Sequence, residues 1–348
     1  MPALPSRPDL EQLRHRAKDL LHAARAGDRA ARSRIDAVAD RVALATAQLA
    51  IAREHGFPSW VQLRAEVDRR RILDDRDLGR LTAALARDPG SATSPLRNWS
   101  DHPHGTAPLS YVAMLRYDTA ARIWREVPGT AAMARALLRA GAPVDGAAGD
   151  PETPLITAAS YGDAGVAQVL IDAGADLAAV AAPTAGGIPG ATALEHAAIF
   201  GMTAVVDVLV GAGAEVGSLA IAAAAGDLTG WELGTESEQD RIRALVMAAD
   251  HERLDVIDEL VAAGTPIDGV DRIWGRQPLW TAAENGRPAG VAHLLAHHAD
   301  PNLRDPEHRT ALDRCRAGRA TQQDGSHHDR VEALLAPGTR GGPASGPR

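Results

Sequence analysis

The chain has 348 residues, of which 45% are hydrophobic and only 3% aromatic. Its core must therefore be built mainly from Ala, Leu and Val, and because Ala and Leu favour helices we expect a mostly α-helical protein. The formal net charge of −8 argues against nucleic acid as the main partner. The single cysteine, Cys315, excludes a disulfide framework and a thiolate-rich zinc site.

The first 25 residues form a charged amphipathic segment with several prolines instead of an apolar signal core. No run of about eighteen apolar residues follows, so no membrane association is expected. These features predict a cytoplasmic protein.

Residues 9–70 contain no repeat and predict four helices. The first has one apolar face, formed by Leu10, Leu13, Ala17, Leu20, Leu21 and Ala24. Asp28 can cap a second helix, a third is expected near 43–55, and Ser59 stands where a fourth would begin. The sequence thus predicts a small N-terminal helical module over residues 1–71.

The rest of the chain repeats one pattern. The segments TPLITAASYGD (153–163), TALEHAAIFGM (192–202) and QPLWTAAENGR (277–287) are variants of each other. Each is followed by a second stretch of common rhythm, such as VAQVLIDAGAD (166–176). Two short helices cannot bury their apolar faces alone, but stacked pairs can, which predicts an α-solenoid.

These segments resemble the ankyrin repeat, with its T-P-L-H-x-A opening and V-x-x-L-L-x-x-G-A second helix. The resemblance implies an all-α stack over residues 72–336, preceded by the helical module, with a disordered tail over 337–348. About seven repeats, numbered one to seven below, are anchored at Leu109, Leu155, Leu194, Leu219, Leu245, Leu279 and Leu312. The module itself resembles one found before ankyrin repeats in actinobacterial proteins.

Several repeats are irregular. Insertions at 118–129 and 228–239 each carry a Trp among charged residues. Repeat four is expected to lack its second helix, replaced by 228–243, and repeat seven to be broken by 316–329. Residues 76–89 could form the second helix of a partial repeat at the start of the stack.

The resemblance implies which positions face a partner. They are the two residues after the Ala-Ala pair of the first helix and the loop before the T-P-L opening. The candidates are Met114, Leu115, Tyr161, Ile199, Phe200, Glu284 and Asn285, with Trp99 and Trp274 from the loops. Aromatic side chains in a groove are typical of interaction hot spots, although they could instead pack between irregular repeats. We therefore expect protein or peptide binding in the concave groove, with no cofactor and no catalysis.

An enzyme or small-molecule binder is the alternative, in a groove closed by the 118–129 and 228–239 insertions. Its candidate groups for proton transfer are Asp101, His102, His104, Glu195 and His196. Adjacent helical residues point about 100° apart, so Glu195 and His196 cannot form a dyad. We favour a structural role in which Glu195 braces the preceding loop in place of the usual His.

The remaining candidates favour structural interpretations. His293 and His297 have the i, i+4 spacing of two ligands to one ion, but no third ligand stands at a recognisable spacing, so no metal is expected. Cys315 replaces an Ala of the repeat, which predicts burial. Dimerisation through the N-terminal helices is a further possibility if Leu13, Leu20 and Ile51 are left uncovered.

Overall fold

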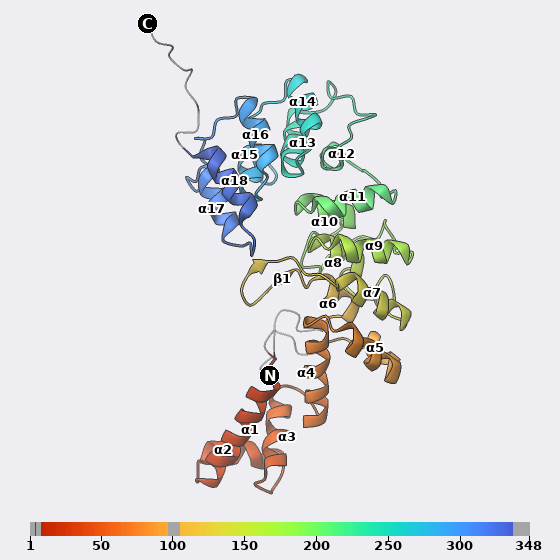
Figure 1. The fold of residues 1–348 in the computed structure, drawn as a ribbon, viewed down its shortest axis with the longest axis vertical. Coiled ribbons are helices and arrows are strands. Elements are labelled where there is room, and N and C mark those ends of the chain that lie inside the picture. The colour runs from red at the N-terminus through yellow and green to blue at the C-terminus, as the bar shows by residue number, and fades with distance from the viewer. Residues whose placement is uncertain (1–3, 5–7, 97–104, 337–348) are drawn as a thin grey trace. The chain divides into compact units, whose positions relative to one another are not determined.

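The structure is a computed structural model that describes residues 4, 8–96 and 105–336. It is helical (Figure 1), and the chain divides into two compact bodies. The first body comprises residues 1–115 and 128–147, and the second comprises residues 116–127 and 148–348. In the described ranges no helix has the length and apolar character needed to cross a membrane.

The first body begins with the four helices that the sequence predicts. They are α1 (Leu10–Arg25), α2 (Arg29–Asp36), α3 (Leu44–Glu54) and α4 (Trp60–Asp74). The side chains of Asp28 and Ser59 accept hydrogen bonds from the first turns of α2 and α4, as local capping chemistry predicts. Leu13 and Leu20 are 4% exposed and Ile51 is fully buried. Because these three side chains are covered within their own chain, the dimerisation hypothesis loses its basis.

The rest of the first body consists of short elements. They are α5 (Leu78–Arg87), the 3-10 helix η1 (Pro89–Ala92), α6 (Pro108–Ala113) and α7 (Thr130–Arg139). Helix α5 confirms that residues 76–89 contain a helix. Arg70 of α4 is completely buried, and its guanidinium lies 3.2 Å from the carboxylate of Glu66. This internal ion pair compensates part of the cost of taking the guanidinium out of water.

The second body is a stack of helical pairs. It contains α8 (Pro154–Ser160), α9 (Ala164–Asp172), α10 (Ala193–Ile199), α11 (Thr203–Gly211), α12 (Leu219–Ala225), α13 (Glu238–Asp250), α14 (Leu254–Ala262), α15 (Pro278–Glu284), α16 (Pro288–Ala296), α17 (Ala311–Arg319) and α18 (Ser326–Leu335). The repeat openings work as helix starts, since Thr153 caps α8 and Thr192 caps α10 through the hydroxyl group. The predicted all-α solenoid is confirmed.

Repeat four has no second helix, as predicted, because residues 226–237 form turns. The expectation that 228–243 as a whole replaces that helix needs correction, since α13 already begins at Glu238. The predicted break at 316–329 is shorter than expected, because only residues 320–325 separate the two helices. Helix α17 continues to Arg319, whose guanidinium bonds Asp329 of α18 at 2.6 Å, so only a short turn separates these helices.

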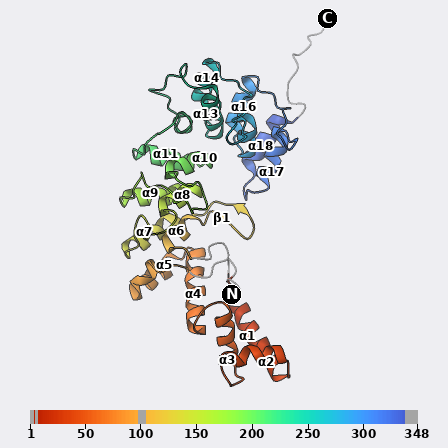
Figure 2. The same cartoon turned by 180° about the vertical axis from the view of Figure 1, so that it is seen from behind.

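The insertion at 118–129 forms an antiparallel hairpin of β1 (Tyr117–Asp118) and β2 (Ile123–Trp124). The backbone of Trp124 donates to the carbonyl of Thr321 at 2.7 Å and accepts from the amide of Gln323 at 2.9 Å. Figures 1 and 2 both show the turn between α17 and α18 coming back beside the hairpin. Two ends of the second body are therefore joined by backbone hydrogen bonds.

Candidate binding surface

The C-terminal end of α10 is held by side chains from repeats five and six. His251 Nε2 donates to the carbonyl of Ala198 at 2.8 Å, and Arg276 Nη1 donates to that of Ile199 at 3.0 Å. Arg287 bonds the carbonyl of Gly201. The last carbonyls of a helix lack partners within the helix and carry partial negative charge, so these donors stabilise the end. The position of Ile199 is consequently well defined.

Two of the predicted partner-facing residues serve this internal network. Asn285 Nδ2 donates to the fully buried carboxylate of Asp250 at 2.8 Å, and Arg287 Nε lies 3.3 Å from the same oxygen. Glu284 pairs with Arg314 at 2.6 Å. Glu284 and Asn285 therefore contribute to the cohesion of the stack, whatever else they contact.

Burial lowers the pKa of His251, which keeps this histidine neutral in the folded chain. Its Nε2 carries the proton that is donated to the Ala198 carbonyl, so Nδ1 accepts from the hydroxyl of Thr203 at 2.9 Å. Both ring nitrogens are thus used within the protein, and His251 has no free group for chemistry.

The loop before α15 carries Trp274. Its fold depends on Asp271, a fully buried carboxylate that accepts from the amide of Trp274 at 2.9 Å and pairs with Arg243 at 3.0 Å. The Trp274 ring has the guanidinium groups of Arg243 and Arg276 each 5.5 Å from its centroid. Because Arg276 also bonds the Ile199 carbonyl, this loop and the end of α10 form one surface.

That surface presents apolar groups to solvent. Phe200 is 38% exposed, directly after Ile199, which is half-buried. The loop adds Val270 and Ile273, which are 40% and 70% exposed. Large hydrophobic side chains that remain in water on a rigid surface are typical of interaction sites.

The hairpin covers another part of the predicted groove. Tyr161 packs against Trp124 and Tyr117, with ring centroids 6.0 and 6.5 Å away. Tyr117 and Trp124 are themselves 4.9 Å apart. Arg116 anchors the base of the hairpin on the carbonyl of Gly162. Tyr161 therefore supports the hairpin.

Other predicted site residues lie elsewhere. Met114 and Leu115 are 7% and 6% exposed, so neither offers much surface to a partner. Trp99, Asp101, His102 and His104 lie outside the residues that the structure describes.

The Glu195 interpretation needs correction. Glu195 accepts from the backbone amide of Thr192 at 2.7 Å and forms a capping box on its own helix. The preceding loop is braced by His196 instead, whose Nε2 accepts from the amide of Ile188 at 3.0 Å. The carbonyl of Thr192 accepts from His196 Nδ1 at 2.8 Å, so both ring nitrogens form hydrogen bonds within the chain. This pair does not form an acid–base site.

Cys315 is 1% exposed, as its place in the repeat predicts. Burial raises the pKa of the thiol to about 11. A thiol with such a pKa carries almost no thiolate at neutral pH and is a poor nucleophile.

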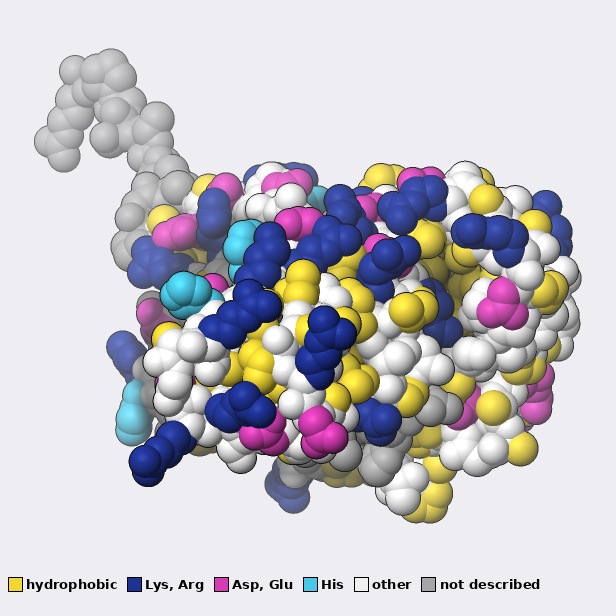
Figure 3. Space-filling model, turned by 90° about the horizontal axis from the view of Figure 1, so that it is seen from below, with side chains coloured by type: hydrophobic (Ala, Val, Ile, Leu, Met, Phe, Trp, Pro, Cys, Tyr) yellow, Lys and Arg dark blue, Asp and Glu magenta, His cyan; other side chains and the backbone are white. Residues whose placement is uncertain are grey.

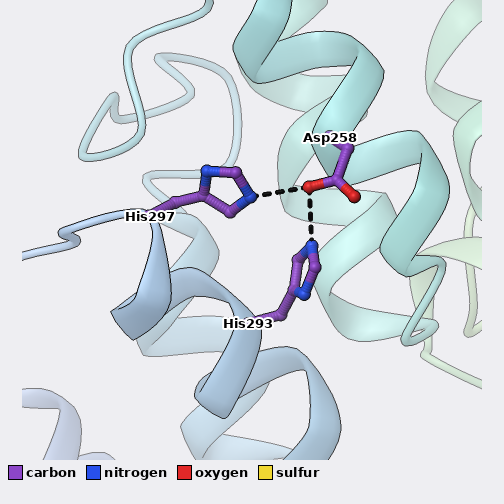
Figure 4. A group of neighbouring side chains, drawn as sticks. All are labelled: Asp258, His293 and His297. Atoms are coloured by element: carbon purple, nitrogen blue, oxygen red, sulfur yellow. Dashed lines mark hydrogen bonds and ion pairs between the residues drawn. The ribbon is translucent and has the colours of Figure 1, made fainter.

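His293 and His297, which lacked a third partner in the sequence, converge on Asp258 of α14 (Figure 4). The space-filling view in Figure 3 shows Lys and Arg side chains spread over a face that also exposes hydrophobic groups, with Asp and Glu more scattered.

Comparison with known proteins identifies the repeats. Residues 127–220 match the family model for ankyrin repeats (3 copies), and residues 274–306 match that for the single ankyrin repeat. The chain therefore contains ankyrin repeats, and these build its all-α stack. Repeats of this family generally mediate protein–protein interactions.

Individual relatives share only part of the chain. The human Espin-like protein is 45% identical over 58 residues, which are 17% of this chain and 6% of that protein. A crystal structure of the human ASB11 ankyrin repeat domain is similar at a TM-score of 0.33 and 20% identity, covering 67% of this chain and 99% of that chain.

Proposed function

We propose that this protein binds a protein or peptide partner through the surface formed by the end of α10 and the loop before α15. Ile199, Phe200 and Trp274 are the proposed anchors. The observation that supports this most is the hydrogen bond from Arg276 to the Ile199 carbonyl, because it joins two segments 77 residues apart that both expose apolar side chains. A preorganised surface binds at a smaller entropic cost than one that must order on binding.

The partner is proposed to combine an apolar side chain with a nearby carboxylate. Among the described residues, Arg276 pairs with no Asp or Glu, whereas the neighbouring Arg243 is neutralised by Asp271. A partner carboxylate could therefore face Arg276 while an apolar group contacts Phe200. A net charge of −8 makes nucleic acid an unfavourable partner for the chain as a whole.

The test is affinity purification with variants. The wild-type chain, the double variant Phe200→Ala/Trp274→Ala and the control Leu44→Ala are immobilised and exposed to an extract of the native cells. Leu44 of α3 is 39% exposed, closely matching Phe200, but lies in the first body. Bound molecules are identified by mass spectrometry, and circular dichroism confirms that all three chains are folded.

A protein recovered with the wild type and the control, but reduced at least about tenfold with the double variant, would support the proposal. Removing two aromatic anchors costs about 2 kcal/mol or more each in typical hot spots, which predicts a larger loss than tenfold. A partner retained equally by all three chains would place binding elsewhere.

The small-molecule alternative is covered by the same experiment. The hairpin at 117–124 does reach the far end of the second body, as a closing insertion would. Yet Glu195 and His196 are occupied by their own turn and loop. A small molecule recovered without any protein would favour this alternative.

A further inference from the structure

Three side chains from two neighbouring helices point at one spot on the second body (Figure 4). His293 lies in the last turn of α16, His297 follows its C-terminal end, and Asp258 lies in the middle of α14. The Nε2 atoms of His293 and His297 are 2.8 and 2.6 Å from the same oxygen, Oδ1 of Asp258. Within the described part of the chain, this is the one group of three His, Cys, Asp or Glu residues whose ligand atoms lie within 4.8 Å of each other.

We propose that Asp258, His293 and His297 form a binding site for a divalent transition-metal ion such as Zn²⁺. Two imidazoles and one carboxylate are a ligand set that suits Zn²⁺, and three protein ligands leave one position for water or a partner's ligand. This inference does not depend on the proposed binding surface, whose residues are different.

The geometry needs only a small adjustment to admit the ion. Zinc is bound about 2.0–2.1 Å from nitrogen and oxygen ligands, so tetrahedral ligand atoms stand about 3.3 Å apart. Both Nε2 atoms would move away from Oδ1 by about 0.5–0.7 Å. The side chains of His293, His297 and Asp258 are 25%, 31% and 51% exposed, so a change of this size requires no repacking of the core.

The local electrostatics favour a cation. The two histidines lie at the C-terminal end of α16, where the helix dipole is negative. Helix α14 adds the exposed acidic residues Asp255 and Glu259 on either side of Asp258.

The competing explanation is a pair of hydrogen bonds without an ion. Two neutral imidazoles donating to one carboxylate oxygen would also give distances of 2.6–2.8 Å. The metal site and the pair of hydrogen bonds differ in one respect. Only the metal site predicts specific, stoichiometric metal binding. An ion here would connect α14 of repeat five to α16 of repeat six.

The test uses the full chain without an affinity tag, freed of metal by a chelator and dialysed. Zn²⁺ alone is titrated in by calorimetry, and native mass spectrometry counts bound ions. We expect one ion per chain with a dissociation constant in the micromolar range or below. Asp258→Asn, His293→Gln and His297→Gln should each weaken binding at least tenfold. Co²⁺ should give the visible absorption of a four-coordinate site in the wild type but in none of these three variants.

The matched control is His327→Gln, at an exposed histidine beside His328 and Asp329 that do not converge on it. This control should bind Zn²⁺ like the wild type. Zn²⁺ should also raise the melting temperature of the wild type and the control, but not of the three site variants. Equal binding by His293→Gln/His297→Gln, or only millimolar binding by the wild type, would overturn the proposal.

Discussion

Three glycines within helices of the second body predict a graded response to alanine. At Gly211, near the end of α11, an added Cβ would meet nothing within 4 Å. At Gly290 of α16 it would lie 2.7 Å from the carbonyl oxygen of Ala249. At Gly318 of α17 the added Cβ would lie 1.8 Å from the carbonyl oxygen of Glu284. None of the three has a positive φ, so alanine is compatible with each backbone conformation.

Two effects of opposite sign decide each outcome. Alanine in place of glycine stabilises a helix by about 0.5–1 kcal/mol. A carbon normally stays about 3.3 Å or more from a carbonyl oxygen, so Gly318→Ala must push α17 away from α15 by about 1.5 Å. Overpacking of this kind typically costs about 1–3 kcal/mol and occasionally more. We expect a small gain for Gly211→Ala, a loss of about 1 kcal/mol for Gly290→Ala, and a loss of about 2–4 kcal/mol for Gly318→Ala.

Urea unfolding followed by circular dichroism measures the three free-energy changes. The comparison is valid where the unfolding free energy of all variants falls with urea concentration at the same slope. That slope reports the surface exposed on unfolding. Gly211→Ala serves as the control for helix propensity alone. If Gly318→Ala were as stable as Gly211→Ala, the close approach of α17 to α15 would not exist in solution.

Other predictions follow from single residues. Because burial lowers the pKa of His251 below the ordinary value of 6.5, the unfolded chain binds more protons below that pH. The free energy of unfolding should therefore fall as the pH drops below about 6.5, and His251→Gln should flatten this dependence in urea titrations at several pH values. Cys315 should react with a thiol reagent only when the chain unfolds, and rapid reaction of the folded chain at neutral pH would contradict its burial. Trp124→Ala should cost about 1–3 kcal/mol of unfolding free energy, since it removes the ring packed on Tyr117 and Tyr161. The same variant should make the hairpin more sensitive to proteases, and an unchanged cleavage pattern would argue against the role of this ring.

The helices could be predicted from the sequence because their signals are local. Asp28 and Ser59 stand one residue before α2 and α4, and both cap the helices that follow. The repeat openings likewise place Pro154 and Pro278 in the first turns of α8 and α15, where proline is tolerated.

The contacts between repeats could not be predicted in the same way. Asp258 lies 35 residues before His293, and nothing in that spacing indicates that the stacking of α14 beside α16 brings them together. The sequence assigned the bracing of the preceding loop to Glu195, but His196 performs it. These two neighbouring side chains face different groups. Glu195 returns to its own N-cap, while His196 faces the loop at Ile188. Such distinctions depend on side-chain direction, which periodicity alone does not specify.

The hairpin of β1 and β2 changes how the stack of repeats can unfold. In most repeat proteins each repeat contacts its nearest neighbours only, so terminal repeats can fray while the middle stays folded. Here the backbone of Trp124 bonds residues Thr321 and Gln323, which are about 200 positions away along the chain. Opening of α17 and α18 away from the hairpin must break these bonds. The hairpin and the last repeat should therefore unfold as one cooperative unit, and that long-range contact should make folding slower than in a simple linear array.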